Sequence, residues 1–138
     1  MVKKIINNNV VLAIILRSNE STNSIEFYTP DDYSQQLGLM KRPKGYEIPP
    51  HVHKPVAREI IHTQEVLFVR KGSMHVDFYD DDKRYLSSEI LSTGDCILLA
   101  SGGHGFRMKE ETEIIEIKQG PYAGEKDKER FKRVLELE

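Results

Sequence analysis

Short apolar or alternating segments separated by turn residues run along most of the chain, and they predict β-strands. Residues 10–16 are apolar at every position and rich in β-branched side chains, which is typical of a strand buried on both faces. Residues 74–79 alternate, and they place Met74, Val76 and Phe78 together on one face. The other predicted strands are residues 24–29, 36–41, 65–70, 85–91, 96–100 and 112–118.

Turn residues between these segments indicate how the strands connect. The Lys71-Gly72 turn predicts a hairpin between the strands on either side of it. In the last predicted strand, alternation is interpreted as Ile115 and Ile117 facing inward, with Glu116 and Lys118 facing outward. Many short strands with regular turns predict an antiparallel sandwich or a barrel, and a barrel leaves no sheet edge open to aggregation.

The end of the chain changes from alternation to helical spacing. Phe131, Val134 and Leu135 recur at helical intervals among charged residues, which predicts a short amphipathic helix at about residues 125–137. The chain is then one domain over residues 1–138, with N-terminal strands at 8–29 and a barrel core at about 36–118.

Composition agrees with one globular domain and excludes several classes of partner. The chain has 138 residues, of which 38% are hydrophobic and 30% charged, enough for one core and unlike a disordered protein. The net charge of -2, with basic and acidic residues interleaved, predicts no nucleic-acid partner.

Residues 10–16 are too short to span a membrane, and Arg17 follows them instead of a cleavage site, so neither a membrane partner nor a signal peptide is expected. Cys96 is the single cysteine, which is consistent with a cytoplasmic protein.

Three histidines and one glutamate are the strongest candidates for chemistry. His51 and His53 are two residues apart, so their side chains would point to the same side of an extended chain. Glu65 and His104 follow later in the sequence. Imidazole nitrogens and carboxylate oxygens suit first-row divalent metals, and four such ligands leave coordination positions open. If the four converge, they predict a divalent metal ion, with zinc, iron, manganese and nickel left open.

The spacing of these residues resembles the two motifs of the cupin family. Gly45-x5-His51-x-His53 and Glu65-x6-Gly72 are similar to the halves of the first motif, although residues 54–64 make the gap between them unusually long. Gly94-x5-Ala100-x-Gly102-Gly103-His104 is similar to the second motif, with alanine in place of proline, a loop one residue short and no following asparagine. The resemblance implies an all-β cupin jelly-roll barrel in which the four candidate ligands hold the metal.

A second resemblance concerns the segment after the predicted barrel. Residues 120–130 read Gly-x-Tyr-x-Gly-x2-Asp-x2-Arg, as in cupin-type phosphomannose isomerases, and they also resemble small cupins of polysaccharide biosynthesis. This implies a small carbohydrate-type ligand inside the barrel, a sugar phosphate or a nucleotide sugar. Sugar isomerisation or epimerisation, iron-dependent dioxygenation and non-catalytic binding all stay open, so the sequence does not decide whether the protein is an enzyme.

The unusually long gap supplies further candidates. Glu59 is the alternative carboxylate ligand, and His62, Glu59 and Tyr122 are candidates for a general acid or base. Arg58 and Lys54 are candidates for holding a carboxylate or phosphate of the ligand, although ordinary surface charge is the simpler explanation of both. Ligand specificity is expected in this gap.

The N-terminal apolar run also bears on the oligomeric state. One face of residues 10–16 can pack on the barrel, but the other face needs a cover. A homodimer formed through the N-terminal strands is therefore expected.

Overall fold

The structure is a computed structural model that describes residues 2–136 of the chain, and it is built almost entirely from strands. The elements in order are β1 (Val2–Asn7), β2 (Val10–Leu16), β3 (Ile25–Phe27), β4 (Gly38–Met40), β5 (Glu65–Lys71), β6 (Ser73–Tyr79), β7 (Tyr85–Ser92), β8 (Cys96–Leu99), β9 (Gly103–Met108), β10 (Glu113–Lys118) and the 3-10 turn η1 (Gly124–Asp127). The predicted all-β class is therefore confirmed.

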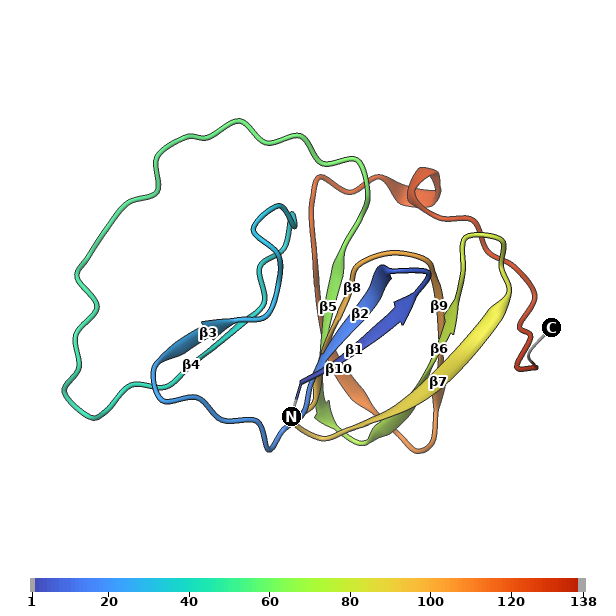
Figure 1. The fold of residues 1–138 in the computed structure, drawn as a ribbon, viewed down its shortest axis with the longest axis horizontal. Coiled ribbons are helices and arrows are strands. Elements are labelled where there is room, and N and C mark those ends of the chain that lie inside the picture. The colour runs from blue at the N-terminus through green and yellow to red at the C-terminus, as the bar shows by residue number, and fades with distance from the viewer. Residues whose placement is uncertain (1, 137–138) are drawn as a thin grey trace.

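Three antiparallel sheets organise these strands (Figure 1). The larger sheets are five-stranded, in the order β1-β2-β8-β5-β10, and three-stranded, in the order β7-β6-β9, while β3 and β4 form a separate hairpin. The main core lies between the two larger sheets and draws on both, for example through Ala13, Leu67, Val76 and Leu91. Within residues 2–136 no sheet closes on itself, so the jelly-roll barrel stays a prediction.

The predicted hairpin across Lys71-Gly72 is wrong. Strand β5 lies between β8 and β10, whereas β6 lies between β7 and β9, so the two consecutive strands belong to different sheets. Gly72 has a φ of 107°, a conformation open to glycine because it has no Cβ, and it redirects the chain from one sheet to the other.

Strand β1 is an element that the sequence pattern did not predict. It pairs with β2 through a tight turn in which Asn8 and Asn9 have φ values of 50° and 63°. Asparagine tolerates this left-handed conformation, and two such residues in succession are typical of a β-hairpin turn. The three consecutive asparagines at residues 7–9 were the sequence feature that could have predicted this turn.

The outer face of β2 is covered by the chain itself. Ile14 and Leu98 on that face pack with Leu37, and Tyr28 and Tyr33 lie against the same cluster. The second face of the N-terminal run is therefore buried without a partner subunit. The homodimer remains a prediction, but this face no longer argues for it.

The predicted orientation of the last strand is reversed. Ile115 pairs with Phe68, and Glu116 pairs with Leu67, whose side chain is in the core. Glu116 and Lys118 are therefore on the side of β10 that faces the space between the sheets, and Ile115 and Ile117 are on the exposed outer side.

The helix predicted at residues 125–137 is also wrong over the residues described. Only η1 is helical, and residues 128–136, here called the C-terminal segment, run across the outer face of the three-stranded sheet. The Tyr79 hydroxyl donates a 2.7 Å hydrogen bond to the Val134 carbonyl, and the Phe131 ring meets the Tyr79 ring edge-on at 5.0 Å. A helix this short is marginal alone, so these tertiary contacts decide the conformation.

No helix among the described residues has the length and apolar character needed to cross a membrane.

A long loop separates β4 from β5. Residues 41–63, here called the long loop, contain no strand or helix and are almost entirely exposed. Figure 1 shows this loop swung out beyond the β3–β4 hairpin, away from the two larger sheets.

Candidate functional site

Two of the four predicted metal ligands meet between the larger sheets. Glu65, at the start of β5, shares the core-facing side of its strand with Leu67 and Val69, and only 8% of it is exposed. His104 comes from β9 in the other sheet, where its neighbour Phe106 packs on the core. The Glu65 Oε2 and His104 Nε2 atoms are 3.9 Å apart. An acidic and an imidazole group from different sheets are thus brought together.

Charged side chains from the last part of the chain surround this pair. On β10, Lys118 is the register partner of Glu65, and Glu116 lies two residues before it on the same face. Lys128, at the start of the C-terminal segment, is close enough for its charge to act on both Glu65 and His104. The pair is therefore covered by two ammonium groups and one further carboxylate.

The surroundings shift both members of the pair toward their neutral forms. Burial raises the pKa of Glu65, and hydrogen bonding to Glu116 and its negative charge raise it further, against the opposing effect of Lys118 and Lys128. Burial lowers the pKa of His104, and the charge of Lys128 adds to this effect. At neutral pH the imidazole of His104 is therefore uncharged, with one nitrogen free to accept a hydrogen bond.

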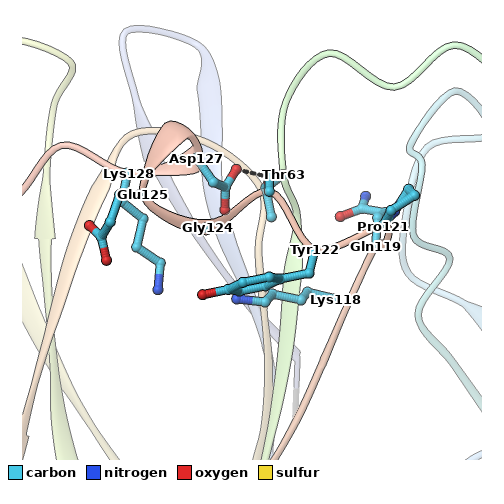
Figure 2. Close-up of a pocket in the computed structure, with 10 residues that line it drawn as sticks. Thr63, Lys118, Gln119, Pro121, Tyr122, Gly124, Glu125, Asp127 and Lys128 are labelled. Carbon is cyan, nitrogen blue, oxygen red and sulfur yellow. Dashed lines mark hydrogen bonds between the residues drawn. The ribbon is translucent and has the colours of Figure 1, made fainter.

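Lys118 and Lys128 line a small pocket of about 60 Å³, whereas Glu65, His104 and Glu116 are not among its lining residues. Figure 2 shows Lys118 and Lys128 lining it from two different elements, β10 and the C-terminal segment, with Tyr122 between them along the chain. The Thr63 hydroxyl at the end of the long loop donates a hydrogen bond to Asp127 in η1, which fixes one wall. The pocket lining comprises Thr63, Lys118, Gln119, Pro121, Tyr122, Ala123, Gly124, Glu125, Asp127 and Lys128.

The other two predicted metal ligands lie elsewhere. His51 and His53 are exposed on the long loop, with ring centroids 5.2 Å apart, and the Nδ1 atom of His51 is 2.9 Å from the Pro49 carbonyl oxygen. In the part of the chain that the structure describes, no three His, Cys, Asp or Glu side chains gather around a point that a metal ion can occupy. The four ligands thus form two separate halves, and no chemistry through a metal is derived from them.

The remaining candidates divide between the loop and the pocket. Lys54, Arg58, Glu59 and His62 are exposed on the long loop, and none of them lines the pocket. Tyr122 lines the pocket, although 89% of it is exposed. Among the three acid–base candidates, Tyr122 is therefore the one placed at this site.

Sequence reasoning missed Glu116, Lys118 and Lys128 as members of the site. Apolar residues at both Ile114 and Ile115 made the two possible orientations of β10 equally consistent with alternation. Only the tertiary structure decides between these orientations, because the pairing of Lys118 with Glu65 fixes which face of β10 points toward the core.

Comparisons of the chain with protein-family models, with curated proteins and with solved structures gave no match. The functional argument therefore depends on the geometry of the described residues.

Proposed function

We propose that the protein binds a small anionic carbohydrate-type ligand, a sugar phosphate or a nucleotide sugar, at the opening between its two larger sheets. The observation that supports this is the convergence of Lys118 and Lys128 on one pocket beside the buried Glu65–His104 pair. Ammonium groups are common ligands of phosphate, and carboxylates accept hydrogen bonds from sugar hydroxyls.

The dimensions of the pocket indicate which part of the ligand it takes. A pocket of about 60 Å³ is much smaller than the roughly 300–1,000 Å³ of ordinary small-molecule pockets, so we propose that it takes only the phosphate end of the ligand. The exposed ring of Tyr122 offers an aromatic face next to it for the rest of the ligand. If the sugar extends from the pocket to the Glu65–His104 pair, these two groups could move a proton, as an isomerase or epimerase requires.

We further propose that the fold is a cupin-type jelly-roll barrel. In support, a five-stranded and a three-stranded antiparallel sheet pack around a common core. The motif residues Glu65 and His104 face the space between these sheets from opposite sides.

The ligand proposal predicts that Lys128→Met weakens binding of a sugar phosphate about tenfold, close to 1.4 kcal/mol. The loss arises because one of two ammonium groups facing the phosphate is removed while the methylene stem is kept. Isothermal titration calorimetry with a panel of hexose phosphates and nucleotide sugars measures it. Lys109→Met removes an exposed lysine from the β9–β10 turn and is expected to leave affinity unchanged.

Two results would contradict the ligand proposal. One is the absence of saturable binding to every member of the panel by the folded wild-type protein. The other is binding that Lys128→Met and Lys109→Met weaken equally, because general surface charge would then explain the attraction.

A divalent metal ion is the second candidate, favoured by the 3.9 Å approach of Glu65 to His104. Elemental analysis of protein purified without chelator is expected to find zinc, iron, manganese or nickel, and His104→Ala is expected to lose it. His75→Ala, on β6, is the matched control and should retain the metal. A wild-type protein that holds no metal even after reconstitution would exclude this candidate.

A further inference from the structure

An arm formed by β3, β4 and the long loop carries much of the apolar surface of the protein. Among residues 2–136, eighteen large hydrophobic side chains are exposed, and nine of them belong to this arm. These nine are Ile25, Phe27, Met40, Tyr46, Ile48, Val52, Val56, Ile60 and Ile61. Half of the exposed large hydrophobic side chains therefore lie on this one arm, which favours an interaction surface there.

The total exposed area supports the same conclusion. The chain exposes 10117 Å², whereas a compact monomer of 15.9 kDa is expected to expose about 7,400 Å². The excess of about 2,700 Å² is slightly larger than the roughly 1,000–2,500 Å² that one subunit loses in an obligate dimer, whose interface totals about 2,000–5,000 Å² over both subunits.

A second apolar surface lies on the outer side of β5 and β10. Phe68, Ile115 and Ile117 are exposed there, and they are here called the receiving face. The same chain covers the neighbouring outer side of β2 and β8 with Tyr28, Tyr33 and Leu37, but that cover ends before β10. Among the described residues, no strand pairs with the outer edge of β10.

The charges of the two surfaces are complementary. Residues 41–60 of the long loop contain five basic and two acidic residues, a net charge of +3. Residues 109–118, which form the β9–β10 turn and β10, contain four glutamates and two lysines, a net charge of -2. Opposite charges on two apolar surfaces favour their association and set its orientation.

We propose that two copies of the chain exchange arms, so that the long loop of each copy covers the receiving face of the other. Figure 1 shows the loop swung away from the five-stranded sheet of its own chain, which leaves it accessible to a second copy. A two-fold axis then makes both contacts equivalent. Four prolines in the loop, at positions 43, 49, 50 and 55, remove backbone donors and suit a covering segment at a sheet edge better than a central strand. This interface is separate from the proposed ligand pocket.

Sedimentation equilibrium tests the interface. The wild-type protein is expected to be a dimer at about 10 μM. Ile115→Glu is expected to raise the dissociation constant of the dimer at least about tenfold, since it places a charge where the proposed interface buries an apolar side chain. Ile90→Glu is the matched control, because Ile90 on β7 is 41% exposed and Ile115 is 42% exposed, yet Ile90 lies outside the receiving face. A wild-type monomer at this concentration, or equal weakening by both variants, would overturn the proposal.

Cysteine cross-linking distinguishes the second copy from closure within one chain. Val56→Cys and Ile117→Cys proteins, mixed and oxidised, are expected to form a disulfide between chains. Burial raises the pKa of the native Cys96 thiol to about 11, so it competes little at neutral pH. If the double variant Val56→Cys/Ile117→Cys instead forms a disulfide within a single monomeric chain, the arm covers its own sheet and the exchange is refuted.

Discussion

Replacing Arg107 with methionine is expected to lower the free energy of unfolding by about 2–4 kcal/mol. The reason is Asp77, whose side chain is fully buried on the outer face of the three-stranded sheet. The Nε and Nη2 atoms of Arg107 each donate a 2.8 Å hydrogen bond to this carboxylate, one to each oxygen. Without them the buried charge keeps only Ser88 and the more distant Arg133, whose Nε atom is 3.8 Å away. Chemical denaturation measures the loss.

Arg70→Met provides the matched control for this ion pair. Arg70 also forms a 3.2 Å ion pair on a strand, with Glu113, but both side chains are mostly in water. Exposed pairs contribute about 0–1 kcal/mol, so this substitution is expected to cost much less than Arg107→Met. Equal losses would show that burial of Asp77 does not set the energy of the Arg107 pair.

The pH dependence of the same variant gives an independent measure. Burial alone would raise the pKa of Asp77, but hydrogen bonds from Arg107 and Ser88 and the charges of both arginines hold it below its ordinary value. This stabilisation is fully present above about pH 4, the ordinary pKa of an aspartate, and it is lost as pH falls through the lower pKa of the folded protein. The stability difference between the wild type and Arg107→Met should therefore shrink as the pH approaches 3.

Replacing Gly72 with alanine is expected to cost about 3–5 kcal/mol, from backbone strain and steric overlap together. The φ of Gly72 is 107°, which side chains rarely tolerate, and an added Cβ would lie 2.6 Å from the Glu111 carbonyl oxygen. Because this residue turns the chain between sheets, neither β5 nor β6 can shift to relieve the overlap without disturbing the core. Thermal or urea denaturation would measure the loss.

Gly45→Ala separates strain from overlap. Gly45 also has a positive φ, 84°, but no atom lies within 4 Å of an added Cβ. Only strain remains, about 1–2 kcal/mol, and the exposed loop around it can relax. If both alanine variants lose the same stability, steric overlap at Gly72 contributes nothing.

The strands could be predicted from sequence more readily than their partners. Apolar runs and alternation are local properties, so the predicted strands 10–16, 74–79 and 85–91 match β2, β6 and β7 closely. Pairing depends on contacts between distant segments, which is why β5 and β6 resembled a hairpin although they lie in different sheets. The helical spacing of Phe131 and Val134 was likewise overridden by their contacts with Tyr79.

The site could be predicted in the same uneven way. Motif spacing found Glu65 and His104, which meet across the two sheets. Lys118 was missed because its orientation depends on the register of β10 against β5. Lys128 was missed because only the path of the C-terminal segment brings it to the pocket. Local patterns carry no information on either of these tertiary arrangements.

The path of the C-terminal segment has a consequence for thermodynamic linkage. Lys128 lines the pocket, and Val134, six positions along, is fastened to Tyr79 on the far side of the other sheet. If the proposed ligand holds Lys128, it would also favour the state in which Val134 is bonded to Tyr79, and by reciprocity that bond would contribute to ligand affinity. A partner or tether that pulled residues 131–134 away from Tyr79 would then weaken binding at the pocket.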